Sequence, residues 1–154
     1  MAIRRKTSEA AVLRALLETA EARKNLIITD LCYAGESAVR HARLNHTYKD
    51  QTGNLTSSIG YVVYEDDKPL KISEFEQITG TKTDKNGKKG SEVGKEYAGE
   101  VAKIAKQKHK LVVVAGMEYA EAVQAKGYEV LQGAIILVKN LLKRWYPDAK
   151  YEER

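Results

Sequence analysis

The amino-acid sequence predicts an α+β fold in which a long N-terminal helix and a C-terminal helix pack on a small, mainly antiparallel β-sheet with a long hairpin. Apolar residues recur at helical spacing over about Ser8 to Leu44 and again over about Leu131 to Tyr146. Between them, segments 55–65 and 70–75 are rich in strand-forming residues and flank a polar turn at 66–69. The length of 154 residues fits one domain, 1–154, around one hydrophobic core.

The N-terminal helix is indicated by a cap, a charge and a periodic face. Thr7 or Ser8 can cap the first turn, and Glu9 places negative charge near the positive end of the helix dipole. The apolar positions of the expected face are Leu13, Leu16, Ala20, Ile27, Leu31, Ala34, Ala38 and Ala42. Segment 25–29 is rich in β-branched residues, which leaves open whether the helix continues through it or breaks in two.

The strand segments predict a hairpin and a central strand. Segments 55–65 and 70–75 pair across the turn, and Pro69 lies at a strand start, where a missing donor is tolerated. The continuously apolar run Leu111 to Gly116 predicts a central strand that is covered on both faces. Residues Lys126 to Val130 are expected to add a brief strand.

The remaining segments connect or extend these elements. Gly80 to Gly94 is a long, glycine-rich, basic stretch that we expect to be a flexible loop. A helix is expected from Lys95 to about Lys108. Pro147 ends the last helix, and the charged tail 148–154 is expected to fray.

Composition limits the compartment and the class. The single cysteine, Cys32, excludes a disulfide within the chain, so the fold does not depend on oxidation, and its helical apolar setting predicts a buried small side chain. No segment approaches the roughly 20 apolar residues of a membrane span, and the basic start is not followed by the apolar region of a secretory signal. We therefore expect no membrane partner and folding in a cytoplasm.

The search for catalytic chemistry is negative. The three histidines, His41, His46 and His109, do not combine with cysteines or carboxylates in a metal-binding spacing. No phosphate-binding glycine loop and no nucleophile elbow is present. The sequence thus predicts no catalytic residue, no cofactor and no metal ligand, and a small hydrolase is the least favoured function.

The segment Lys82 to Lys110 suggests an alternative function. It holds nine lysines and four acidic residues, a net charge of +5. Such a segment can meet phosphates, so a small basic nucleic-acid-binding or regulatory module stays open. Lysines without arginines or interleaved aromatic residues do not predict specific DNA recognition, and a solvated loop explains them equally well.

A turn-and-strand segment, 51–60, is the most distinctive feature of the chain. It reads Gln-Thr-Gly-Asn-Leu-Thr-Ser-Ser-Ile-Gly. Gly53 permits a backbone conformation that is costly for other residues, and Thr52 and Asn54 can hydrogen-bond to local backbone. The segment therefore turns the chain sharply into the first strand.

Two pairs of residues are expected to fix the position of this segment and of a later one. Leu55 and Ile59 are four apart, so in a strand they face the same side and anchor the base of the hairpin in the core. Tyr119 and Ala120 place an aromatic next to a small side chain, which suits close packing against another element or subunit. Both motifs are also explained as turns that serve the fold alone.

These segments resemble the tail-completion (neck, head–tail joining) proteins of long-tailed bacteriophages over roughly residues 48–127. In that family a "(D)TG-x-L-x-x-S-I" segment leads into the first strand, and here residues 51–59 match it. A second family segment, "V-x-V-G-x-x-x-x-Y-A-x-x-V-E-x-G", is similar to residues 112–127. Gln51 and Gln124 stand where the family usually has Asp and Glu, and the proline-containing segment after the second motif is absent.

The resemblance implies a virion structural protein of the phage neck. It implies a homo-oligomeric ring, a hexamer or dodecamer, between portal-side connector proteins and tail-tube-side proteins, with DNA passing through the lumen. A tail terminator or a head-closure protein of the same neck is the alternative.

The residues expected to carry this role fall into two sets. The fold-defining motif residues are Thr52, Gly53, Asn54, Leu55, Ser58, Ile59, Tyr119 and Ala120. The candidate assembly contacts, on the hairpin and the basic loop, are Tyr61, Tyr64, Asp66, Asp67, Lys82, Lys85, Lys88 and Lys89. The terminal helices are expected to add further contact surface.

Overall fold

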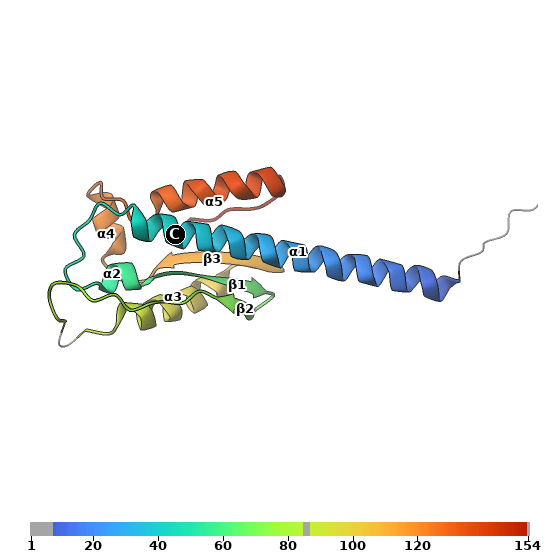
Figure 1. The fold of residues 1–154 in the computed structure, drawn as a ribbon, viewed down its shortest axis with the longest axis horizontal. Coiled ribbons are helices and arrows are strands. Elements are labelled where there is room, and N and C mark those ends of the chain that lie inside the picture. Colours follow the sequence, from blue (N-terminus) through green and yellow to red (C-terminus); the bar gives the residue numbers. More distant parts are fainter. Residues whose placement is uncertain (1–7, 85–86, 154) are drawn as a thin grey trace, which may run out of the picture.

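A computed structural model describes residues 8–84 and 87–153, and it confirms the predicted α+β class (Figure 1). The elements in chain order are α1 (Glu9–Leu44), α2 (Asn54–Ser57), β1 (Ile59–Glu65), β2 (Lys68–Ile72), α3 (Gly90–Ile104), β3 (His109–Ala115), α4 (Ala120–Ala125) and α5 (Gln132–Trp145). The long α1 and the C-terminal α5 lie side by side next to a three-stranded antiparallel sheet.

The sheet has helices on both faces. Tyr61 and Val63 of β1 pack with the buried residues of α1 and α5 on one face. Val62 and Tyr64, the alternate residues of the same strand, pack with Ala98 and neighbouring residues of α3 on the other. The strand order is β2-β1-β3, so β1 is the central strand.

This order corrects the expectation that segment 111–116 is the central strand. β3 pairs with β1 alone and is an edge strand, and its residues alternate between buried and half-buried. A continuous apolar run indicates cover on both faces, which β3 has from α1 and α3. It does not indicate a neighbour on both edges, and in an antiparallel sheet the two properties are independent.

The first strand also begins later than expected. Segment 54–57 forms the single helical turn α2, and β1 starts at Ile59. Leu55 and Ile59 are both buried, but they belong to separate apolar clusters and do not share a strand face. The reason is local, because the hydroxyls of Ser57 and Ser58 donate to the carbonyls of Gly53 and Leu55 and so favour a turn over a ladder.

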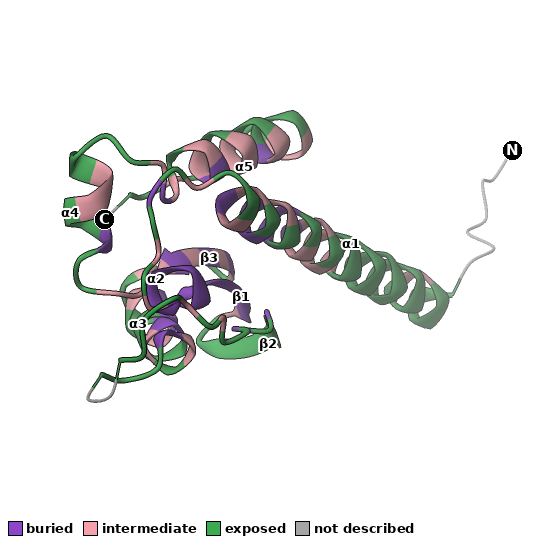
Figure 2. Cartoon of the chain, turned by 60° about the vertical axis from the view of Figure 1, so that its left-hand side comes forward, coloured by how far each residue is buried: buried purple, intermediate pink, exposed green. Residues whose placement is uncertain are grey.

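The helix α1 is continuous through segment 25–29. Ser8 caps it by accepting a hydrogen bond of 3.2 Å from the backbone N–H of Ala11. Thr29 fits within the helix because its hydroxyl donates to the carbonyl of Asn25 at 2.9 Å. Only the second half of α1 is packed in the core, and the first half runs out beyond the rest of the molecule (Figures 1 and 2).

The helix α3 begins inside the segment expected to be a loop. It starts at Gly90 and ends at Ile104, where a helix over 95–108 was predicted. Gly90 and Gly94 lie in the segment expected to be a loop, but a Cβ at Gly90 would lie 2.0 Å from the carbonyl oxygen of Asn54, and one at Gly94 would lie 2.5 Å from that of Ser58. These two glycines therefore permit close packing of α3 against segment 54–58. The connection to α3 ends at residue 89, five residues earlier than expected.

The C-terminal part differs from expectation at two places. Segment 126–130 is a turn and an irregular stretch in which Gly127 has φ +85°, and no strand forms there. After α5, the tail returns to the molecule, because Tyr151 packs against the core and Glu153 pairs with Lys139. The tail therefore contacts the body where fraying was expected.

Candidate functional site

Asp50 organises the turn that precedes β1. One carboxylate oxygen accepts a hydrogen bond of 2.9 Å from the backbone N–H of Gly53, and the other accepts one of 2.7 Å from that of Thr56. A side-chain acceptor thus satisfies backbone donors that a helix start leaves unpaired. Gly53 has φ +77°, and a Cβ there would lie 2.1 Å from the carbonyl oxygen of Ile78. The expected requirement for glycine at this turn is confirmed.

Asn54 joins three segments that are distant in the sequence. Its side-chain oxygen accepts from the amide of Gln77 and from the backbone N–H of Gly90, each at 3.2 Å. Its amide nitrogen donates to Asp84 at 3.3 Å. The local hydrogen bond expected of Thr52 is present, since its hydroxyl accepts from the N–H of Asn54 at 3.3 Å, but the side chain of Asn54 serves long-range contacts.

The second sequence motif meets the first at the start of the sheet. Ile59 pairs with Ala115, and the N–H of Gly116 donates to the carbonyl of Ser58 at 3.2 Å. Gly116 also lies against Gly94 of α3, where a Cβ on Gly116 would come within 2.6 Å of the Gly94 Cα. We call this region, where segments 50–60 and 115–120 meet, the motif junction.

The end of the second motif packs on the same region. Ala120 is buried in a small apolar cluster with Tyr48, Leu55 and Val130. Tyr119 is 42% exposed, and burial together with the nearby carboxylate of Asp50 raises the pKa of its phenol. The two sequence motifs therefore include both segments of the junction. They did not show that Tyr48 and Asp50 complete it.

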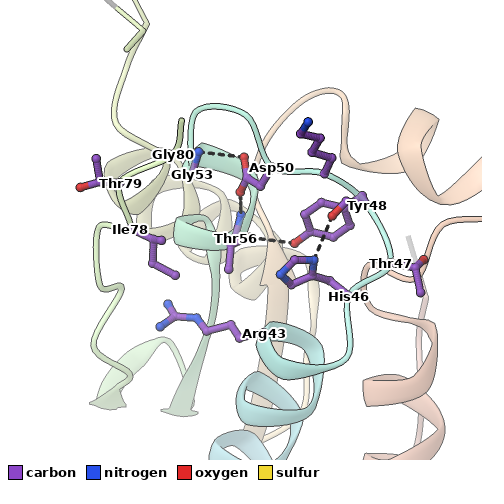
Figure 3. Close-up of a pocket in the computed structure, with 11 residues that line it drawn as sticks. Arg43, His46, Thr47, Tyr48, Asp50, Gly53, Thr56, Ile78, Thr79 and Gly80 are labelled. Atoms are coloured by element: carbon purple, nitrogen blue, oxygen red, sulfur yellow. Dashed lines mark hydrogen bonds between the residues drawn. The ribbon is translucent and has the colours of Figure 1, made fainter. Parts of the chain in front are cut away.

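A pocket of 530 Å³ opens beside the motif junction (Figure 3). The ring of His46 stacks on Tyr48 with centroids 4.5 Å apart, and the Tyr48 hydroxyl lies 3.1 Å from the hydroxyl of Thr56. From the end of α1, Arg43 donates to the carbonyl of Ile59 at 2.9 Å, and burial lowers the pKa of its guanidinium. These contacts tie α1 to the junction.

The pocket does not assemble a nucleophile with a base. Both oxygens of Asp50 are engaged by backbone donors, and the Nδ1 of His46 lies 3.0 Å from the carbonyl of Tyr48. Within residues 8–84 and 87–153, no group of three or more His, Cys, Asp or Glu side chains is placed to hold a metal ion.

The structure overturns two of the predicted assembly contacts. Tyr61 is 0% exposed and Tyr64 is 7% exposed. The hydroxyl of Tyr61 donates to Glu36 of α1 at 2.8 Å, while Tyr64 packs beneath α3. Because both faces of the hairpin's first strand are covered by helices, its aromatic residues build the core and cannot contact a neighbouring subunit.

The other predicted contacts that the structure describes lie at the surface. Asp66, which has φ +52°, and Asp67 form the exposed tip of the β1–β2 hairpin. Lys82, Lys88 and Lys89 are exposed on the segment before α3, and Lys88 pairs with Glu96 at 3.5 Å. The remaining candidate, Lys85, lies outside the described residues.

The first half of α1 exposes an apolar surface whose extent the sequence did not predict. The α1 overhang, which we define as residues 9–26, contains no buried side chain. Its leucines Leu13, Leu16, Leu17 and Leu26 are 58–63% exposed. The periodic apolar face was predicted, and the terminal helices were expected to add contact surface, but the sequence did not show that the first half of this face is left uncovered.

Two broader observations complete the description. Comparison of the chain with protein-family models, with curated proteins and with solved structures gave no match. In the part of the chain that the structure describes, none of the helices combines the length and the apolar character that crossing a membrane requires.

Proposed function

We propose that this chain is a structural subunit of the neck of a long-tailed bacteriophage, where it forms a ring that joins the capsid connector to the tail. The motif junction is the observation that carries the proposal. The two segments that resemble the tail-completion family, 51–59 and 112–127, are far apart in sequence, yet they meet through Ile59 and Ala115 and through Ser58 and Gly116. A chance similarity of two short motifs gives no reason for such a contact.

The exposed surfaces support a role in assembly. The hairpin tip, with Asp66 and Asp67, and the segment with Lys82, Lys88 and Lys89 extend from opposite ends of the sheet region. The α1 overhang adds an exposed apolar surface of a kind that soluble proteins use for association. A subunit with contacts on several sides suits a closed homo-oligomer, for which a hexamer or dodecamer is proposed.

Electron microscopy of virions from the phage that encodes the chain tests the proposal. The expected result is density for this fold, in a ring, between the portal-side connector and the tail tube. The level of the ring distinguishes tail completion from tail termination and head closure. Virions whose neck density lacks the chain would exclude the proposal.

Genetic complementation provides a second test with a matched control. We expect a phage without the chain to accumulate filled heads and unattached tails, and the wild-type gene to restore joining. Lys82→Glu and Lys89→Glu, which change exposed side chains on the proposed contact segment, should impair joining. Lys106→Glu, an exposed change after α3, is the control that should still join heads to tails.

A further inference from the structure

The α1 overhang exposes three leucines on one face of the helix. Leu13, Leu16 and Leu17 are 59%, 62% and 63% exposed, and Ala20 lies between them and the body. We call these four residues the apolar stripe. Figure 2 shows the overhang as mostly exposed, in contrast to the buried residues of the same helix beside the sheet.

The apolar stripe continues the face with which α1 enters the core. Leu13 precedes the buried Leu31 by five helical turns, and Ala20 precedes the buried Ala38 by the same spacing. Five whole turns return a side chain to the same direction, so the stripe points to the side on which the body lies. Beyond the end of the body, nothing in the described part of this chain covers that side.

We propose that the apolar stripe is the contact surface for the α1 overhang of a second copy of this chain, packed antiparallel to the first. Lys24, near the end of the overhang, pairs with Glu65 of β1 at 3.0 Å. The part before it is an amphipathic helix of about 22 Å, long enough for a two-helix contact of four turns. A second copy supplies an identical stripe, and antiparallel packing covers both stripes at once in an isologous contact.

The position of the body fixes the antiparallel direction. From Leu31 onward, the stripe side of α1 is occupied by the sheet and by α5 of the same chain. A parallel partner would bring its own sheet and α5 to the same side and the same level, where the two bodies would overlap. An antiparallel partner carries its body at the opposite end of the paired helices.

The charges that flank the stripe are complementary in this arrangement. Arg14 and Glu21 lie on the same flank of the stripe, three residues before and four residues after Leu17. A twofold axis near Leu17 brings Arg14 opposite Glu21 of the partner subunit, and the symmetry repeats this pair on the other subunit. In a parallel twofold pair the two copies of this flank would lie on opposite sides of the contact, so Arg14 would not face Glu21 of the partner subunit.

The inference concerns the free protein and does not rest on the proposed function. In a single cyclic ring every subunit points the same way along the axis, so a twofold pair is not a contact of that ring. The pair is a solution state that covers the stripe before any other assembly. A chain without a place in the virion would still form it, and a ring subunit could still fail to form it.

The oligomeric state of the full chain tests the proposal. Sedimentation velocity over a concentration series should show a reversible dimer of the wild type. Leu17→Glu should raise the dimer dissociation constant at least about 100-fold, because it places two charges in the apolar contact. Leu26→Glu is the matched control, because Leu26 is 58% exposed and lies half a turn away from Leu17 on the opposite face. It should change the constant less than about threefold.

A charge exchange tests the flanking contacts. Arg14→Glu should weaken the dimer, and the double variant Arg14→Glu with Glu21→Arg should restore it, because the exchange re-forms both pairs across the axis. Circular dichroism should show the same helical content for all variants. A monomeric wild type at about 100 μM, well above the micromolar range of weak specific contacts, would overturn the proposal. Equal weakening by Leu17→Glu and Leu26→Glu would also overturn it.

Disulfide trapping tests the direction. In a Cys32→Ser background, Leu17→Cys should cross-link rapidly within the dimer because the two copies of this position meet near the axis. Leu13→Cys should cross-link slowly, since antiparallel packing separates its two copies along the helix. Rapid cross-linking at both positions would show a parallel pair and would contradict the proposal.

Discussion

The carboxylate of Asp50 accepts a hydrogen bond of 2.7 Å from the backbone N–H of Thr56. One side chain from the preceding loop thus fixes the turn that starts the sheet. Its second oxygen holds the N–H of Gly53 at 2.9 Å. Thr56 in turn contacts the hydroxyl of Tyr48, which connects the turn to the small apolar cluster with Ala120. The motif junction therefore depends on a residue just outside the segment that the sequence singled out.

Asp50→Ala should lower the free energy of unfolding by about 1–2 kcal/mol, the usual cost of removing a helix-capping side chain. Two backbone donors lose their acceptor at once, so a value at the upper end is expected. Urea denaturation monitored by circular dichroism measures the change. Lys49→Ala alters the exposed neighbour and should stay within about 0.5 kcal/mol of the wild type. Equal stabilities of the two variants would contradict the assigned role of Asp50.

Gly53→Ala and Gly127→Ala separate steric clash from backbone conformation. Both glycines have positive φ, +77° and +85°, so alanine costs about 1–2 kcal/mol at either position. At Gly53 the new Cβ would also lie 2.1 Å from the carbonyl oxygen of Ile78, while at Gly127 nothing lies within 4 Å. Gly53→Ala should therefore destabilise the fold by at least about 2 kcal/mol more than Gly127→Ala. Similar unfolding midpoints for the two variants would exclude the close approach to Ile78.

The sequence predicted the order of the main elements because each carries a local signal. The periodic face of α1 and the β-branched residues of β1 are examples. Gly53 was also predictable, because glycine in a polar turn before a strand indicates a left-handed backbone. These properties depend on neighbours within a few residues.

The rest depends on contacts between distant segments, which one sequence does not specify. Tyr61 and Tyr64 lie in a hairpin segment where the sequence predicts surface contacts. In the structure α1 covers Tyr61 on one face of the sheet, and α3 covers Tyr64 on the other. Leu13 and Leu31 occupy the same helical face, yet only Leu31 meets another element. Periodicity shows which side of a helix is apolar, and only the tertiary arrangement shows how far along the helix that side is covered.

Lys110 makes a structural contact that distinguishes it from the other lysines of the basic segment. It is 6% exposed, and its ammonium donates to the carbonyls of Ala102 and Ala105 at 3.1 and 3.0 Å, at the end of α3. Its third partner, Asp67, is 84% exposed at the side chain and can be solvated without it. Lys110→Met keeps the apolar stem but leaves two carbonyls without this donor.

We expect Lys110→Met to lower the free energy of unfolding by about 1–3 kcal/mol, the range for leaving buried polar groups unsatisfied. Lys106→Met, at an exposed site, should change it by less than about 0.5 kcal/mol. Chemical denaturation of both variants under one set of conditions measures the difference. An unchanged stability of Lys110→Met would show that water replaces the ammonium at the end of α3.

The stability of the fold should fall at alkaline pH through Tyr146. Its hydroxyl donates to Asp30 of α1 at 2.6 Å, and burial together with this carboxylate raises the pKa of Tyr146 to about 12. In the unfolded chain the pKa of a tyrosine is about 10. Below pH 10 the phenol is neutral in both states, so its contribution is fully present. As the pH rises from about 10 to about 12, the unfolded state loses its proton first, which favours unfolding, and the contribution is lost.

Tyr146→Phe should make the alkaline decline of the unfolding free energy less steep by up to about 1.4 kcal/mol per pH unit, the slope that one proton contributes. The variant loses the hydrogen bond to Asp30, so it should be less stable than the wild type at pH 7, and the two should converge above pH 12. Tyr128→Phe, at a residue that is 46% exposed, is the control and should follow the wild-type curve. Denaturation at half-unit steps from pH 8 to pH 12 measures the slopes. Parallel curves for Tyr146→Phe and the wild type would contradict the coupling, because a phenol that titrates alike in both states adds no pH dependence.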